Sequence, residues 1–418
     1  MKKLLAFSAA LLSIGAVQAE ALSLSYIGQQ IVESGRSYAG TTVGGLSGID
    51  YNAATGRYLA ISDDRSSINP ARFYELSLDI SKFQRSATAN SAGVSFNAVT
   101  TIVNIDGKPF AANQVDPESL RLDAARNRIY WSNEGQRAAA GFQDPTVRSM
   151  NLDGSYAGAF SIPERFKPSG SNSGLNAGDR GIYNNLAFES LTLSKDGKTL
   201  WTATENALSQ DDLPATVGKG SNARLLSFDL STGKAGAEYV YQVDAVALPP
   251  TPAGGFATNG LTELLALDDR QFIAIERSFS AGAVTPGTSP SGNPTGNTIR
   301  LYYVDARQAT DVSGLDSLKG ETFTAMSKEL LLDLSSLKND DGSALALDNI
   351  EGITLGPVID GKQTLILVSD NNFGATQFTQ FVALSIQAPV PEPESYALLL
   401  AGLGLLSLVA RQQGMRAG

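Results

Sequence analysis

One short pattern recurs five times along this chain and limits its fold more than any other feature. The copies span residues 45–64, 117–134, 188–205, 261–276 and 350–370. Each copy opens with an acidic or small residue, then has a short apolar run, a turn, a second apolar run and a closing acid. The copies are 71, 71, 74 and 88 residues apart, counted from the opening residues Ser47, Glu118, Glu189, Glu263 and Glu351. Repetition at a long period is typical of architectures built from one supersecondary unit.

Each copy is expected to form half of a four-stranded unit. Further strand-like runs follow each hairpin, for example ARLLSFDL and AEYVYQV after the third copy. One hairpin plus two strands makes a blade, and radial repetition of blades makes a propeller. A β-sandwich would not repeat at this period, and a parallel β-helix would repeat at a far shorter one. The sequence therefore predicts an all-β fold, a β-propeller of four-stranded antiparallel blades, with five repeats visible and six blades as the alternative.

The last blade lacks a fourth strand of its own, because only the run QFVALSI follows the hairpin of the fifth copy. The run ALSLSYIGQQIV near the N-terminus has the alternating pattern of a strand. We expect this N-terminal strand to close the last blade, so that both ends of the propeller domain meet in one sheet.

The repeated acids are predicted to meet at one end of the propeller. In an antiparallel hairpin the first residue of one strand lies beside the last residue of the next. If the opening strands are innermost, nine carboxylates converge on one mouth of the central channel. The expected pairs are Glu118 with Glu134, Glu189 with Glu205, Glu263 with Glu276 and Glu351 with Asp370, while Asp63 faces Ser47 in the first copy.

A cluster of this kind needs bound protons or a cation, because neighbouring carboxylates disfavour joint ionisation. Oxygen-rich acidic clusters are what Ca²⁺ requires. The expected metal ligands are Asp63, Glu134, Glu205, Glu276 and Asp370, and the expected catalytic carboxylates are Glu118, Glu189, Glu263 and Glu351. Arg65, Arg180 and Arg277 lie close to the copies and are expected to bind substrate. The alternative is that the acids are structural and pair with backbone N–H groups and arginines between blades.

Two missing residue types restrict the chemistry further. The chain has no Cys and no His. A disulfide framework, a thiolate nucleophile, a Ser-His-Asp triad and a histidine–zinc centre are therefore excluded. Proton transfer would fall to Asp, Glu, Lys, Tyr or a metal-bound water. The formal net charge of −10 repels nucleic acid and anionic lipid headgroups, so no nucleic-acid partner is expected.

Both ends of the chain have the pattern of targeting signals. Two lysines precede an apolar run that ends in small residues, so residues 1–19 are predicted to be a signal peptide. Near the C-terminus, Val-Pro-Glu-Pro precedes an apolar segment at 396–410, and Arg411 follows it. About 20 apolar residues are usual for a spanning helix, so this segment is short for a permanent transmembrane anchor.

These patterns resemble two known signatures. The Pro-Glu-Pro triplet, the short apolar segment and the terminal arginines of residues 389–418 resemble the PEP-CTERM sorting signal. That resemblance implies an exosortase as partner, a transient membrane anchor, and export to the periplasm or cell surface. The segments NLAFESLTLSKDGKTLWTATENAL and IEGITL…LILVSDNNF resemble the phytase-like family labelled "esterase-like activity of phytase". The resemblance runs through most of residues 40–385, within an expected domain at 20–388, and implies a propeller and phosphoester or carboxylester hydrolysis.

The leading hypothesis is an exported Ca²⁺-dependent phosphoesterase or esterase. Its substrate would be a phosphorylated or esterified small molecule or a polysaccharide, with metal ions neutralising phosphate and arginines gripping its oxygens. Two alternatives stay open. One is a glycosidase that uses two carboxylates, and the other is a non-catalytic surface propeller that binds exopolysaccharide and holds structural Ca²⁺.

Overall fold

A computed structural model of the chain describes residues 22–387. These residues form an all-β structure whose only helical segments are the single 3₁₀ turns η1 (Ile80–Lys82), η2 (Glu164–Phe166) and η3 (Leu334–Ser336). No helix in this part of the chain is long and apolar enough to cross a membrane. The predicted signal peptide at 1–19, the sorting tail at 389–418 and its apolar segment at 396–410 lie outside the described residues.

Five four-stranded sheets form the blades, numbered here in chain order. Blade 1 contains β4 (Leu46–Asn52), β5 (Arg57–Ser62), β6 (Arg72–Leu78) and β7 (Val94–Thr101). Blade 2 contains β8 (Pro117–Asp123), β9 (Arg128–Asn133), β12 (Thr146–Met150) and β13 (Tyr156–Ala159). Blade 3 contains β14 (Phe188–Leu193), β15 (Thr199–Thr204), β16 (Ser221–Asp229) and β17 (Ala235–Val243). Blade 4 contains β18 (Ala257–Asp268), β19 (Gln271–Ser280), β20 (Asn297–Asp305) and β21 (Ser327–Asp333). Blade 5 contains β22 (Asn349–Ile359), β23 (Lys362–Asp370), β24 (Thr379–Gln387) and β1 (Ser23–Val32).

Two small hairpins lie outside the blades. They pair β2 (Ser37–Tyr38) with β3 (Thr41–Thr42), and β10 (Gln136–Ala138) with β11 (Gly141–Gln143).

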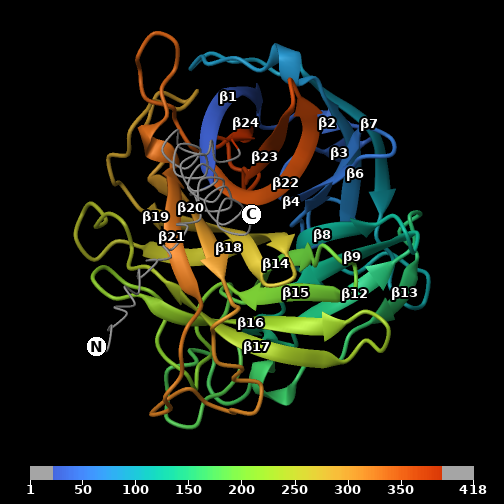
Figure 1. Ribbon diagram of the computed structural model, residues 1–418, viewed down its shortest axis with the longest axis vertical. Helices are drawn as coiled ribbons and strands as arrows, with labels where there is room; N and C mark the ends of the chain where they lie inside the picture. The colour runs from blue at the N-terminus through green and yellow to red at the C-terminus, as the bar shows by residue number, and fades with distance from the viewer. Residues whose placement is uncertain (1–21, 388–418) are drawn as a thin grey trace, which may run out of the picture. The chain divides into compact units, whose positions relative to one another are not determined.

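The first strand of each repeat is the innermost strand of its blade. Strands β4, β8, β14, β18 and β22 contact one another in sequence around the centre, and β22 returns to β4 (Figure 1). Each hairpin predicted from a repeat is present, as the antiparallel pairs β4–β5, β8–β9, β14–β15, β18–β19 and β22–β23. The five-bladed propeller is confirmed, and the six-bladed alternative is wrong.

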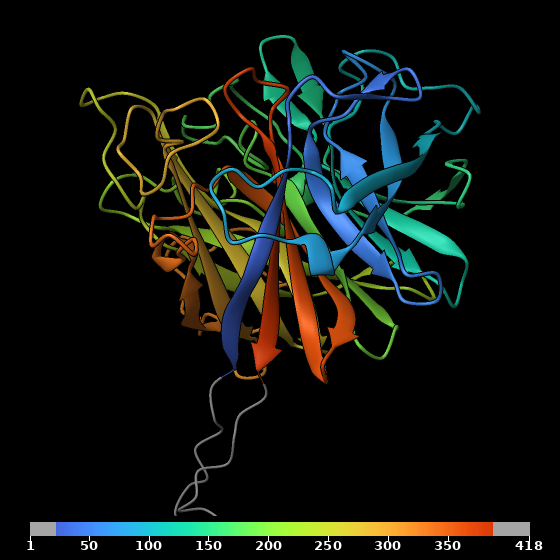
Figure 2. The ribbon, with the colours of Figure 1, turned by 90° about the horizontal axis from the view of Figure 1, so that it is seen from above.

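The N-terminal strand closes the ring as predicted. In blade 5 the strand order is β1-β24-β23-β22, so β1 supplies the outer strand that the C-terminal part of the repeat lacks. Figure 2 shows β1, in blue, beside the orange and red strands of this blade. The ring is therefore completed by hydrogen bonds between the two ends of the domain.

Apolar faces packed between neighbouring blades form the core. Trp131 belongs to the cluster between blades 1 and 2, and Trp201 to the cluster between blades 3 and 4. Both rings are almost fully buried, which confirms that they pack between blades. Full burial of a large apolar side chain contributes about 1.5–3 kcal/mol. This packing fixes the inner strands, whose first residues build the mouth of the channel.

Candidate functional site

Each inner strand has a β-bulge, and in blades 2, 3 and 5 the residue at the bulge is an acid that lines the mouth. In all five hairpins the register shifts just after the first pairs, so that at least one residue of the inner strand has no partner opposite. A bulge of this kind re-aims its side chain. The residues at this bulge position are Ser47, Glu118, Glu189, Thr262 and Glu351.

A second position, at the end of the neighbouring strand, completes the site. The residue just before each bulge pairs with Ser62, Asn133, Thr204, Glu276 or Ser369 on the adjacent strand. The next residue along that strand lines the mouth in every blade except blade 2. The residues at this closing position are Asp63, Glu134, Glu205, Arg277 and Asp370.

The expected meeting of Glu263 and Glu276 at the mouth is wrong. Glu263 lies one residue after the bulge position, which Thr262 occupies in blade 4, and Glu276 lies one residue before Arg277. A shift of one residue along a strand turns the side chain to the other face. Blade 4 therefore presents Thr262 and Arg277 where blades 2, 3 and 5 present two acids.

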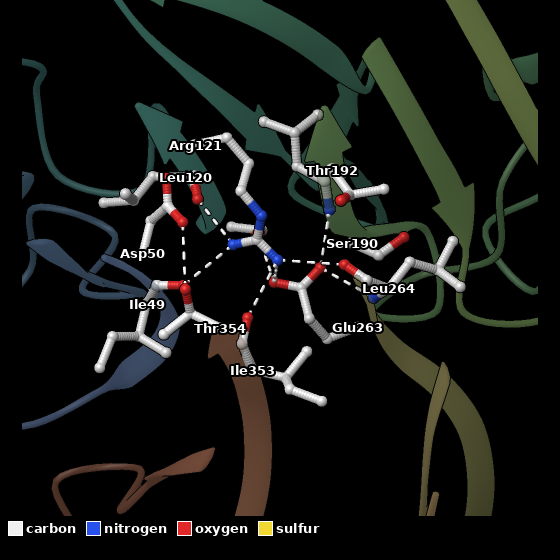
Figure 3. A network of polar contacts seen from close by, with 12 residues as sticks. Ile49, Asp50, Leu120, Arg121, Ser190, Thr192, Glu263, Leu264, Ile353 and Thr354 are labelled. Carbon is white, nitrogen blue, oxygen red and sulfur yellow. Dashed lines mark hydrogen bonds and ion pairs between the residues drawn. The ribbon is translucent and has the colours of Figure 1, made fainter. Parts of the chain in front are cut away.

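Glu263 lies instead in the middle of the propeller, paired with Arg121 (Figure 3). Its Oε2 is 3.0 Å from Arg121 Nη2, and its carboxylate also accepts hydrogen bonds from Ser119 and from the backbone N–H of Leu191. The Glu263 side chain has no exposed surface. Burial raises its pKa to about 7, and Arg121 opposes the rise.

Arg121 ties the inner strands together around this pair (Figure 3). Its guanidinium donates to the carbonyl oxygens of Ile49 on β4 at 3.0 Å and Ile353 on β22 at 3.2 Å. It also donates to its own strand and to Leu264 on β18. Glu263 adds β14 through Leu191. One buried ion pair thus links all five blades beneath the mouth.

Glu276 is likewise engaged away from the mouth. It forms an ion pair with Lys328 and accepts hydrogen bonds from the Tyr241 hydroxyl at 2.8 Å and from Asn259 Nδ2 at 2.9 Å. Its exposed fraction is 2%. These contacts satisfy the carboxylate between blades 3 and 4, which corresponds to the structural role that the sequence left open.

The remaining acids surround a cavity of about 1040 Å³ at the mouth. Six of the nine predicted carboxylates line it, together with Arg65 and Arg277. The lining acids from the prediction are Asp63, Glu118, Glu189, Glu205, Glu351 and Asp370. Glu134 is nearly inaccessible to solvent and lies within reach of the lining acids Glu118 and Glu189.

Two arginines neutralise part of this negative charge through ion pairs. Arg277 Nη2 is 2.9 Å from Glu351 Oε1 and 3.5 Å from Glu205 Oε1, so it joins the acids of the two blades that flank its own. Arg65 forms an ion pair with Asp116 and donates to Asn185 Oδ1 at 2.7 Å. Both guanidinium groups face the cavity.

Arg180, the third predicted substrate-binding residue, is not part of this site. Its guanidinium is 3.6 Å from Asp316 and its side chain is 42% exposed, outside the lining of the cavity. Its backbone carbonyl accepts a hydrogen bond from the buried Arg137. Arg180 is close to the third repeat in the sequence. This closeness did not show that the intervening loop places the Arg180 side chain away from the cavity.

Burial and mutual repulsion strongly perturb the cavity acids. Burial is the main cause that raises the pKa of Glu118 and Glu189 well above the usual range, and neighbouring carboxylates add to the rise. Asp63, Glu134 and Asp370 are shifted in the same way. Burial also raises the pKa of Glu205, to about 7, although Arg277 opposes it. Without a cation, burial and mutual repulsion therefore disfavour the ionised forms of these groups.

The donor set fits an oxygen-liganded cation. Glu134 belongs to two triads, one with Asp116 and Glu118 and one with Glu189 and Glu205, in which one oxygen from each acid lies within 4.8 Å of the others. Glu205 lines the cavity and is 1% exposed. Its Oε1 accepts no hydrogen bond and has Arg277 Nη2 3.5 Å away. Hard cations such as Ca²⁺ bind sets of carboxylate oxygens of this kind.

The repeat pattern did not predict several residues that line the cavity. Asp116 lies two residues before Glu118, opposite Glu134, where the other blades have Gly, Ala or Asn. Its position before the second repeat was the available signal. Asp348 and the aromatic pair Phe256 and Phe279 also line the cavity. They flank the repeats, so no repeated pattern marked them.

Comparison with known proteins finds a secreted relative and a sorting motif. An uncharacterized secreted protein of Arthroderma benhamiae is 25% identical over 198 residues, which cover 46% of this chain and 36% of that protein. The match thus spans about a third of the relative's length. Residues 389–415 match the PEP-CTERM protein-sorting motif, which implies sorting by an exosortase.

Solved structures of similar arrangement are only remotely related. An endo-1,4-β-xylanase from Bacteroides thetaiotaomicron has 8% identity and a TM-score of 0.42, with 84% of this chain and 97% of that chain covered. The periplasmic gluconolactonase of Pseudomonas aeruginosa has 11% identity and a TM-score of 0.31, with 74% and 100% covered. Neither likeness carries an argument about function.

The residues that form the blades and the acidic mouth match the model of a known protein family. Residues 41–373, from the start of blade 1 into the end of the fifth hairpin, match the family described as phytase-like, with esterase-like activity of phytase. The match covers the bulge and closing positions of every blade. The chain therefore belongs to the phytase-like family.

Proposed function

We propose that this protein is an exported hydrolase that cleaves phosphoesters or carboxyl esters at the mouth cavity with the help of Ca²⁺. The observation that carries the proposal is the convergence of eight lining carboxylates and two arginines in a chain that has no His and no Cys. Membership of a family described by esterase-like activity supports the same reaction class.

The two triads around Glu134 are the proposed Ca²⁺ ligands. Asp116, Glu118, Glu189 and Glu205 supply the other oxygens. A bound cation would neutralise the negative charge of the substrate and of the transition state. It would also offset the repulsion that now raises the pKa values of these acids.

Arg277 is the proposed anchor for the substrate's negatively charged oxygen. Its guanidinium lines the cavity and has donors besides the Nη2 that contacts Glu351. Arginine binds phosphoryl and carboxylate oxygens through paired N–H donors. Arg65, whose side chain is 33% exposed at the opposite wall, is the second candidate.

Glu351 is the proposed proton-transfer group, because it lines the cavity and belongs to neither proposed Ca²⁺ triad. Burial raises its pKa above the usual range, although Arg277 opposes the rise, and a raised pKa brings a carboxyl closer to the range in which it both accepts and donates a proton at neutral pH. In hydrolysis the oxygen of water bonds to phosphorus or to the acyl carbon, and the ester bond to the alcohol breaks. The carboxylate takes one proton from the water and returns one to the departing alcohol.

Export places the cavity where Ca²⁺ is abundant. The sorting motif, and the description of the Arthroderma benhamiae relative as secreted, support export to the periplasm or cell surface. We propose that the C-terminal tail anchors the chain transiently before an exosortase processes it.

The test is a substrate panel with the full-length protein in millimolar Ca²⁺. Phytate, simple phosphomonoesters and simple carboxyl esters are assayed for release of phosphate or alcohol. We expect release from at least one class and a loss of about 100-fold or more in the Glu351→Gln variant, since general acid–base groups contribute about 10²–10⁴-fold. No release from any class, together with strong stabilisation by Ca²⁺, would support a non-catalytic binding propeller instead.

A further inference from the structure

The wall that blade 4 contributes to the cavity differs from the other walls. Blades 1, 2, 3 and 5 contribute all the lining acids, whereas the described residues of blade 4 and its loops contribute none. Arg277 stands at the position where the other four blades have an acid. Next to it the wall carries no charge. Its apolar lining residues are Phe256, Ala257, Phe279 and Pro294, with Pro214 and Ala215 from blade 3, and its uncharged polar ones are Thr258, Ser289, Ser291, Asn293, Thr295 and Asn297.

Phe256 and Phe279 form an aromatic pair on this wall. Their ring centroids are 6.1 Å apart, and the ring planes are inclined by 39°. Phe256 lies just before β18 and is 68% exposed. An isolated exposed Phe needs no explanation. Here the exposed ring lies against a second aromatic ring in the lining of the cavity, and that combination is typical of ligand pockets.

Phe279 lies on the same strand as Arg277, the proposed anchor for the substrate. It follows Arg277 by two residues on β19, so both side chains project from the same face of the strand. Two residues of a strand advance by about 6.8 Å. Arg277 and Phe279 therefore line the same wall of the cavity, one strand repeat apart.

We propose that the cavity selects esters that carry a planar apolar ring. This inference rests on the proposed function and specifies its substrate class. The anionic or ester group lies between Arg277 and the acidic walls, and the ring packs on Phe256 and Phe279. A compact polyanion without an apolar face, such as phytate, cannot pack on the two rings.

The test measures binding, so it does not depend on turnover. Phenylphosphonate and methylphosphonate are titrated by calorimetry into the full-length protein in Ca²⁺. Both probes carry the same charged group, and only one has a ring. Aromatic packing stabilises a bound ring beyond the burial of its area, so we expect phenylphosphonate to bind about tenfold more tightly.

Variants locate the preference on this wall. Phe256→Ala should reduce the preference to about twofold or less while leaving methylphosphonate binding unchanged, and Phe256→Tyr should keep it. Phe256 is mostly exposed, so the alanine variant is expected to fold, which its melting temperature checks. The matched control is Leu330→Ala, because Leu330 is 51% exposed on β21 and does not line the cavity.

The outcomes separate this inference from the proposed function. Equal affinity for the two probes, no binding of either probe, or a preference that persists in Phe256→Ala would overturn the ring-selective wall. Hydrolysis of simple esters would then still support the proposed function. A ring preference lost in Phe256→Ala, in a protein that hydrolyses no ester, would support the wall and refute the hydrolase.

Discussion

Glu205 reaches the mouth because the residue packed against it, Gly260, has no side chain. A Cβ at Gly260 would lie 2.1 Å from Glu205 Oε1, much closer than any real contact. Gly260 does not have a positive φ, so the conflict is one of space and not of backbone strain. Glycine here keeps open the place of a proposed Ca²⁺ ligand.

We predict that Gly260→Ala displaces Glu205 and weakens Ca²⁺ binding by about tenfold or more, comparable to the loss of an orienting contact in other metal sites. Calorimetric titration with Ca²⁺ measures the change. Gly314→Ala is the matched control, because a Cβ there meets nothing within 4 Å. Equal Ca²⁺ affinity in the two variants would contradict the proposed role of Glu205.

At the scale of the elements, the inner strands depend on the Arg121–Glu263 pair. Arg121 contacts the carbonyls of four blades, and Glu263 contacts the fifth. Loss of one partner leaves the other charge buried and unpaired, which typically costs about 3–5 kcal/mol.

We therefore predict that Glu263→Ala lowers the free energy of unfolding by about 3–5 kcal/mol, as measured by urea denaturation. Glu329→Ala on β21, where the side chain is exposed, is the control and should change stability little. If Glu263→Ala retained full stability, the pair would not hold the inner strands together.

The repeats predicted the blades well because their apolar alternation determines which faces pack. The same alternation gave the order of strands in each hairpin and the need for β1 in the last blade. The bulges were not visible, because an extra residue in a strand changes its register without changing its composition. In blade 4 two polar residues adjoin at each position, Thr262 with Glu263 and Glu276 with Arg277, so the sequence left the register open by one residue.

At the scale of the whole molecule, the acid cluster makes stability depend on pH. In the folded state the pKa of Glu205 is about 7, raised from 4.5, and those of Glu118, Glu134 and Glu189 are also raised well above 4.5. A carboxyl with a raised folded-state pKa stabilises the fold fully below its unfolded value, and this contribution is lost as the pH rises through the folded value.

We predict that, in EDTA, the melting temperature falls as the pH is raised from about 4.5 through 7 and beyond. Ca²⁺ should reverse most of this loss at pH 7 to 8, because a cation bound only by the folded state stabilises it. Thermal unfolding monitored by circular dichroism measures both effects. A melting temperature that rises over this range in EDTA would contradict the clustered acids.

The most direct test of the account is the rate of ester or phosphoester hydrolysis as a function of free Ca²⁺, in the wild type and in Glu134→Gln. Glu134 belongs to both proposed triads and does not line the cavity. We predict a rate that rises with Ca²⁺ and saturates in the wild type. In Glu134→Gln the half-saturating Ca²⁺ concentration should increase at least tenfold. A wild-type rate independent of Ca²⁺, or the same half-saturation in both proteins, would contradict it.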